Sequence, residues 1–96
     1  MSESILQTEP ECYITGSTQN LDRHHIYHGP RRTASEIFGC WVWLRHDIHM
    51  ALHSKGLYDD DLKKVCQYRF EQLYSHETFM QVFGKSYLKE ESDGTE

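Results

Sequence analysis

The stretch CWVWLRHDIHMALHS, residues 40–54, decides how this chain folds. Aromatic and β-branched side chains dominate its first five residues, which predicts a strand over 40–44. The remainder, from His46 to Ser54, predicts a helix, because Gly56 follows just past its end as a helix-terminating glycine does. The helix would thus follow the strand immediately and could pack across it.

Working outward from this stretch toward the N-terminus, a second strand is predicted over residues 22–27 and is ended by Gly29-Pro30. Residues 33–38 predict a short helical turn that ends at Gly39. Thr33 is its expected N-cap, with Glu36 three residues later as the partner in a capping box. Residues 11–14 are β-prone. The two main strands are expected to pair as a hairpin.

The chain changes character after Gly56. Three consecutive aspartates, residues 59–61, place negative charge where a helix dipole favours it, at an N-terminus. Apolar residues then recur at helical spacing as far as Leu73. Ser75 is expected to cap a further short helix, closed by Gly84. The predicted class is therefore α+β: a β-hairpin and helix, with C-terminal helices packed on it.

Length and composition bound the possibilities. Ninety-six residues make one small domain, which we place at 11–88, between a flexible acidic segment at 1–10 and a disordered acidic tail at 89–96. No run of about 18 apolar residues is present, so no membrane span is expected. The polar N-terminus does not resemble a secretory signal. Three widely spaced cysteines favour reduced thiols, and so a cytoplasmic protein.

Charge is distributed unevenly along the chain. The net charge is −5, but residues 1–11 and 89–96 each carry −3, which leaves +1 on residues 12–88 and +3 on residues 23–55. Basic side chains therefore gather in the same part of the sequence as most of the histidines. Such a balance permits a phosphate-bearing partner without demanding one.

Histidine is the most informative residue type, since six of the seven lie between positions 24 and 53. His24 and His25 are adjacent, whereas His49 and His53 are one helical turn apart. If the helix packs across the hairpin, three nitrogens can hold a divalent ion while the fourth histidine acts as a general base. Adjacent strand residues point to opposite faces, so both His24 and His25 reach one site only if the strand end twists or bulges. The other three histidines, His28, His46 and His76, are expected at the surface.

This order of residues resembles the HNH endonucleases, which have the ββα-metal fold. The resemblance starts from His24-His25-Ile26, whose distance in sequence to His49 and His53 is similar to that of the colicin-type DNases. Residues 12–88 also resemble a group of small phage-encoded HNH-like proteins, which are similar to recombination-associated nucleases. The segments that carry this second resemblance are Cys12-Tyr-Ile-Thr-Gly16, Leu21 to Gly29, Arg32-x-x-Ser35-Glu36-x-x-Gly39 and Phe83-Gly-Lys-Ser-Tyr-Leu88.

The resemblance implies a metal-dependent DNA endonuclease. It assigns His24, His49 and His53 to one divalent ion, which could be Mg²⁺, Mn²⁺, Ni²⁺ or Zn²⁺, and His25 to the role of general base. Asp22 is expected to orient a histidine, and Cys40 falls at or near the position of the middle asparagine of the HNH signature. Phosphate contacts are expected from Arg31, Arg32 and Arg45. The implied partners are DNA and phage or host recombination proteins.

Two departures from the family pattern keep other functions open. Three of the four cysteine positions of the zinc knuckle found in many HNH proteins are missing, so no structural zinc is expected. The absent asparagine favours an inactive HNH-like fold that binds DNA or a protein without cutting, whereas the intact spacing of four histidines favours the enzyme. A histidine-rich metal carrier is a third possibility, which the candidate general base and the basic flank disfavour.

Overall fold

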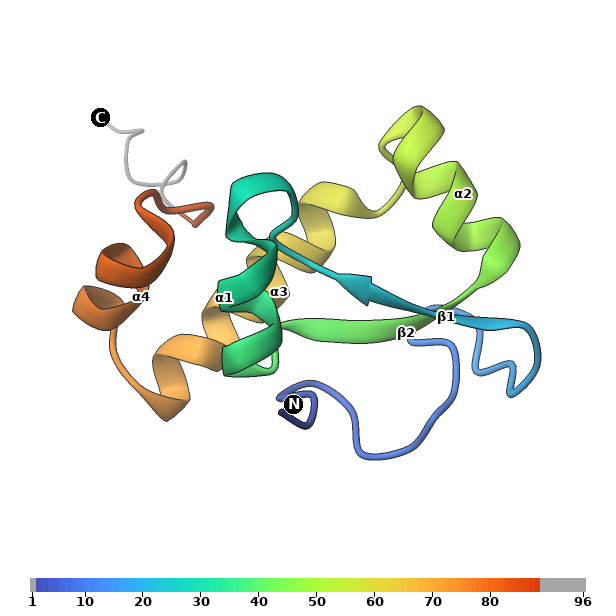
Figure 1. The fold of residues 1–96 in the computed structure, drawn as a ribbon, viewed down its shortest axis with the longest axis horizontal. Helices are drawn as coiled ribbons and strands as arrows, with labels where there is room; N and C mark the ends of the chain where they lie inside the picture. The colour runs from blue at the N-terminus through green and yellow to red at the C-terminus, as the bar shows by residue number, and fades with distance from the viewer. Residues whose placement is uncertain (1, 89–96) are drawn as a thin grey trace.

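The computed structural model describes residues 2–88 and has the predicted α+β class (Figure 1). The described residues form a two-stranded antiparallel sheet and four α-helices, and the first α-helix lies between the two strands in sequence. In order, the elements are β1 (Leu21–His25), the 3-10 helix η1 (Gly29–Arg31), α1 (Arg32–Phe38), β2 (Trp41–Arg45), α2 (His46–Lys55), α3 (Asp59–Leu73) and α4 (His76–Phe83). The acidic tail predicted for 89–96 lies outside the described residues.

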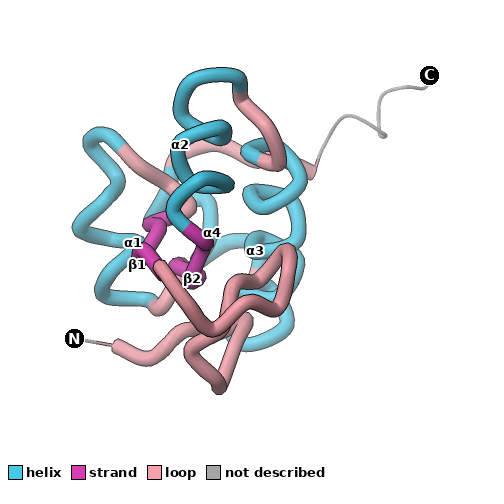
Figure 2. Tube along the Cα trace, turned by 90° about the vertical axis from the view of Figure 1, so that its right-hand side faces the viewer, coloured by secondary structure: helices cyan, strands magenta, loops and turns pink. Residues whose placement is uncertain are grey.

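The paired strands and α2 form the part of the fold that positions the histidines. β1 and β2 pair with Leu21 opposite Arg45 and His25 opposite Trp41, and α2 starts at the residue directly after β2. Gly56 ends α2 in the left-handed conformation, with φ of 75°. Figures 1 and 2 show α2 on one side of the strands and the N-terminal segment on the other. The predicted hairpin followed by a helix is thus confirmed.

Residues 2–10 lie along the outer edge of β2 (Figure 1). The Ser4 hydroxyl donates to the Trp41 carbonyl at 2.6 Å, and the Trp43 amide donates to the Gln7 side chain at 2.8 Å. The Ile5 amide donates to the carbonyl of Gly39. The polar side chains that suggested a loose segment are therefore the groups that satisfy the edge of the strand.

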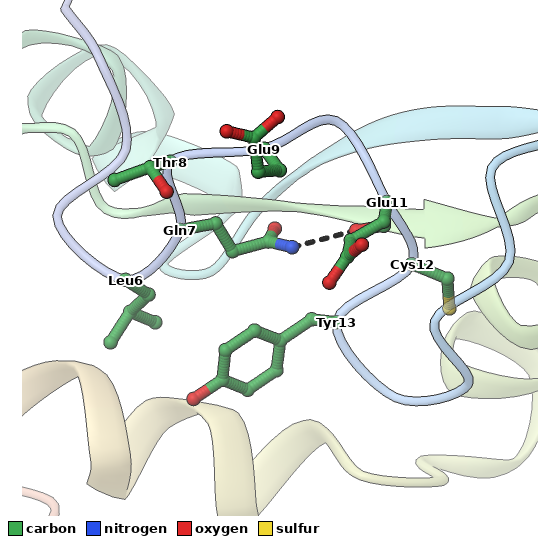
Figure 3. Close-up of a pocket in the computed structure, with 7 residues that line it drawn as sticks. All are labelled: Leu6, Gln7, Thr8, Glu9, Glu11, Cys12 and Tyr13. Carbon is green, nitrogen blue, oxygen red and sulfur yellow. Dashed lines mark hydrogen bonds between the residues drawn. The ribbon is translucent and has the colours of Figure 1, made fainter.

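The β-prone stretch 11–14 forms turns rather than a strand. Its Tyr13 amide donates to the Trp43 carbonyl at 2.8 Å, so it too lies against β2, but through a single backbone bond. The chain between Leu6 and Tyr13 curls around a small cavity of about 260 Å³ (Figure 3). The side-chain amide of Gln7 donates to the backbone carbonyl of Glu11 across it. An isolated backbone contact does not make a ladder, which is why this β-prone stretch forms no strand.

α4 lies at the opposite end of the molecule from α2, with α3 between them (Figure 1), and aromatic side chains from α3 and α4 belong to the core. Tyr27, just past β1, packs its ring against Phe79 and Phe83 and donates its hydroxyl to the Lys63 carbonyl at 2.7 Å. Ser75 caps α4 as predicted, because its hydroxyl accepts from the Thr78 amide at 3.0 Å. This core holds the helices to the strands.

The start of α1 differs from the prediction. The helix begins at Arg32 and has no side-chain cap, so Thr33 is not the N-cap and the expected capping box does not form. The Ser35 hydroxyl bonds both the amide and the carbonyl of Tyr27, and the Glu36 side chain turns toward β1. Ser35 and Glu36 thus both bond to residues outside α1, and Glu36 does so in place of its predicted role in the capping box.

None of the helices within residues 2–88 has both the length and the apolar character needed to cross a bilayer.

Candidate metal centre

Three histidines converge between the sheet and α2. His24 extends from β1 and faces His49 and His53 on α2, and one ring nitrogen from each lies within 4.8 Å of the other two. The ring of His24 is 5.1 Å from that of His49 and 5.5 Å from that of His53, centroid to centroid. These three side chains could hold a metal ion, as the sequence predicted.

The spacing within α2 suits a shared ion. The Nε2 atoms of His49 and His53 are 3.1 Å apart. Two nitrogens bound to one tetrahedral zinc at about 2.0–2.1 Å would lie about 3.3 Å from each other. Residues at i and i+4 lie one above the other on a helix, which brings the two rings together without distortion of the backbone.

The buried position of His24 is an independent indication that a metal ion fits this site. The residue is only 2% exposed, and its Nε2 is buried with no hydrogen-bond partner among the described residues. A buried polar atom without a partner costs free energy, so it calls for a ligand. Burial, together with the nearby His49 and His53, lowers the pKa of His24 to about 3. The ring is therefore neutral at neutral pH, which is the form that binds a metal.

Asp22 forms hydrogen bonds with two histidines, one of which belongs to the cluster. Its Oδ2 accepts from Nδ1 of His49 at 3.0 Å and from Nδ1 of His46 at 2.7 Å. These hydrogen bonds, first that from His49, hold the pKa of the Asp22 carboxyl below its usual value. A proton on Nδ1 of His49 leaves the lone pair of its Nε2 directed at the cluster, the common arrangement behind a metal-bound histidine.

His28 lies at the surface, as predicted, at the edge of this cluster. Its ring centroid is 6.0 Å from that of His24 and 5.8 Å from that of His53, and its Nε2 is 3.3 Å from Oδ1 of Asp59 at the start of α3. The side chain is 40% exposed.

His25 points to the other face of β1, as strand alternation requires. Its Nε2 lies 2.7 Å from Oε1 of Glu36 on α1, and the pKa of Glu36 is lowered, first by this hydrogen bond. The two faces nevertheless share one opening of about 250 Å³, here called the histidine pocket. It is lined by Arg23, His24, His25, His28, Arg32, His49 and His53.

Both His24 and His25 border the histidine pocket, although adjacent residues of a strand point to opposite faces. β2 is covered along its outer edge by the N-terminal segment, whereas β1 is the other strand of a two-stranded sheet. Side chains from both faces of an outer strand can border a single pocket at the strand's edge. His24 and His25 thus both line this opening from a strand whose register with β2 is continuous, although only His24 belongs to the three-histidine cluster.

The three predicted phosphate-binding arginines separate in the structure. Arg32 lines the histidine pocket. Arg31 instead donates to the Phe83 carbonyl at the end of α4, and Arg45 forms two hydrogen bonds to the Asp47 carboxylate at 2.6 and 2.9 Å. Arg23, which the sequence analysis did not single out, lines the pocket and lies over the Trp41 ring at 3.7 Å.

Cys40 does not occupy the bracing position suggested by the HNH pattern. It is fully buried in the core and hydrogen-bonds with the thiol of Cys66, whose pKa is raised first by that contact and then by burial. It does not line the histidine pocket. All three cysteines are free and buried. Cys40 therefore contributes to packing, because a small apolar side chain at the start of β2 faces the helices rather than the site.

Comparison of the chain with protein-family models, with curated proteins and with solved structures found no match.

Proposed function

We propose that this protein is a metal-dependent endonuclease that hydrolyses phosphodiester bonds in DNA. The observation that carries the proposal is the histidine pocket, in which three converging imidazoles share an opening with a fourth histidine and with Arg32. A three-histidine set leaves positions open for water and substrate, which is typical of catalytic rather than structural sites. The sequence resemblance to HNH endonucleases, with its hairpin followed by a helix, supports the same activity.

In this proposal His24, His49 and His53 would hold a divalent ion. When bound there, the ion would act as a Lewis acid on a phosphate oxygen and would stabilise negative charge on the leaving 3′-oxygen. The chain contributes the ligand geometry through α2 and the neutral state of His24 through burial. Asp22 contributes by keeping the His49 ring in the orientation that presents Nε2 to the cluster.

The other side chains of the pocket supply acid–base chemistry and substrate binding. His25 accepts a proton from the attacking water as the new P–O bond forms and the bond from phosphorus to the 3′-oxygen breaks. Arg32 binds a phosphate oxygen and positions the strand without reading its sequence. The cleaved 3′-oxygen takes its proton from solvent, which leaves a 3′-hydroxyl on one product and a 5′-phosphate on the other.

The test is plasmid nicking with Mg²⁺, Mn²⁺, Ni²⁺ or Zn²⁺, each with and without chelator. We expect metal-dependent nicking that is lost in His25→Ala while metal binding, measured by calorimetry, is retained. His76→Ala is the matched control, since His76 also pairs with a carboxylate, Glu71, but lies on α4 outside the histidine pocket. Nicking by His25→Ala at the wild-type rate would contradict the proposed mechanism.

A binding module that holds DNA without cleavage is the second candidate. Two of the three predicted phosphate-binding arginines are engaged elsewhere, and Cys40 is in the core, so the pocket departs from the HNH pattern in both respects. In the same assay, this function would give DNA retention in a gel with every metal and no nicking with any of them.

A further inference from the structure

We propose that Glu36 is the positioning residue for His25: its carboxylate selects the His25 tautomer that carries a proton on Nε2 and has a free lone pair on Nδ1. The inference rests on the proposed function, in which His25 is the general base. A histidine can accept a proton from water only through an unprotonated nitrogen, so whatever sets the tautomer decides which nitrogen does the work.

The hydrogen bond itself carries the first step. Nε2 of His25 and Oε1 of Glu36 are 2.7 Å apart, and an ionised carboxylate can only accept. Donation from His25 lowers the pKa of Glu36, so the carboxylate is ionised at neutral pH. The His25 side chain is only 10% exposed. The proton of the neutral ring is thereby assigned to Nε2.

The second step is that Glu36 is itself held in place. Its Oε2 lies 3.5 Å from a guanidinium nitrogen of Arg23, and that guanidinium lies over the Trp41 ring at 3.7 Å from the ring centroid. Arg23 also donates to the carbonyl of Ser2 at 3.2 Å, and the Trp41 indole donates to the same carbonyl at 2.9 Å. Among the described residues Oε2 has no hydrogen bond, so the ion pair with Arg23 is what restrains this end of the carboxylate.

The third step concerns the helix that carries Glu36. The neighbouring Ser35 is fully buried and ties α1 to Tyr27 through two hydrogen bonds, so Glu36 extends from a fixed piece of backbone. Its side chain is 28% exposed and lies beside the histidine pocket rather than sealed below it. Its role therefore acts through the orientation and tautomer of the His25 ring.

A purely structural ion pair between α1 and β1 would show the same contacts. The variants below separate this structural role of Glu36 from its role in positioning His25. Glu36→Gln keeps an acceptor oxygen at the right distance but breaks the charge pairing with Arg23. Glu36→Ala removes both. The matched control is Glu71→Ala, since Glu71 accepts from Nδ1 of His76 at the same 2.7 Å, outside the pocket.

The first measurement is the tautomer of His25, read from the ¹⁵N shifts of its ring in the metal-free protein at about pH 8, above the ordinary imidazole range. We expect the Nε2-protonated form in the wild type and in Glu36→Gln, and a mixture of tautomers in Glu36→Ala. The control Glu71→Ala should leave the His25 signals unchanged. A wild-type ring protonated on Nδ1, or the same spectrum in all variants, would overturn the inference.

The second measurement is the rate of DNA nicking by each variant at a saturating concentration of the metal ion. We expect Glu36→Ala to lower kcat by about 10²-fold with little change in KM for DNA or in metal affinity, and Glu36→Gln to recover part of the loss. A loss confined to thermal stability, with kcat unchanged in the folded variant, would assign Glu36 to structure alone. If the wild type cuts no DNA with any metal, the proposed function fails, and the ring shifts still decide whether Glu36 sets the tautomer.

Discussion

His49 and His53 bring their Nε2 atoms to 3.1 Å from one another across one turn of α2. In the metal-free protein, one of these nitrogens must donate to the other. Because Asp22 accepts from Nδ1 of His49, His49 is the acceptor and His53 the donor in this pair. A divalent ion would replace the shared proton, so the pair is arranged for a metal before one arrives.

Metal binding should depend on these imidazoles and not on their neighbours. We expect His53→Ala to weaken binding of Zn²⁺ or Ni²⁺ severely, whereas His46→Ala, which removes another histidine of α2 bonded to Asp22, should change the affinity little. Wild-type protein at 100 times the dissociation constant should gain about 2.7 kcal/mol of stability. Calorimetry and thermal melts measure both effects, and equal losses in the two variants would argue against the three-histidine site.

Asp22→Asn should weaken metal binding by about 10- to 100-fold, because the ring of His49 loses the acceptor that orients it. The amide is close in shape to the carboxylate, so the fold should be retained. Asp47→Asn, on the first turn of the same helix but paired with Arg45, serves as the control. Unchanged affinity in Asp22→Asn would show that the Asp22–His49 bond does not act on the metal site.

Metal-free protein should lose stability as the pH falls from about 6.5 toward 3, through the buried His24. Burial lowers the pKa of His24 to about 3 in the folded state, so over this window the unfolded chain binds the extra proton and folding is disfavoured. The contribution is fully present above the unfolded pKa. Its loss by about pH 3 is on the order of 4 kcal/mol. Urea unfolding of wild type and His24→Phe at several pH values checks this, since the variant should lack the slope.

Gly39→Ala should be more destabilising than Gly56→Ala, although both glycines end helices in the left-handed conformation with φ near 75°. The new methyl group at Gly39 would meet the carbonyl oxygen of Glu3, whereas at Gly56 it would meet open space. The strain of about 1–2 kcal/mol is common to both, so the difference reports on the packed N-terminal segment. Denaturant titrations that gave equal losses would mean that this segment is not held against Gly39.

Arg32→Ala should weaken DNA binding and reduce the slope of log affinity against log salt by about one, as expected for one phosphate contact. Arg45→Ala should leave both nearly unchanged, because Arg45 is paired with Asp47 and does not line the histidine pocket. Fluorescence anisotropy with a short duplex at several salt concentrations measures the slope. Identical slopes for the two variants would place the DNA elsewhere on the surface.

Local sequence signals predicted the elements well, because each rests on residues within a few positions of one another. The aromatic strand at 40–44, the helix closed by Gly56 and the helix capped by Ser75 all appear within one residue of their expected bounds. The i, i+4 spacing of His49 and His53 is equally local. A helix holds such a pair on one face wherever it packs, so two of the three converging ligands were determined before any tertiary contact was known.

Only the tertiary structure decided the assignments in which two partners compete for one polar side chain. The sequence offered Glu36 a local role in a capping box. In the structure its Oε1 instead lies 2.7 Å from Nε2 of His25, a residue of β1. Arg31 reaches α4, and Cys40 meets Cys66 in the core, rather than the positions that the family pattern suggested. The polar segment 2–10 found the open edge of β2 in the same way. Sequence lists the donors and acceptors a chain has, but which of them meet depends on contacts between residues far apart in sequence, and those form only when the whole chain has packed.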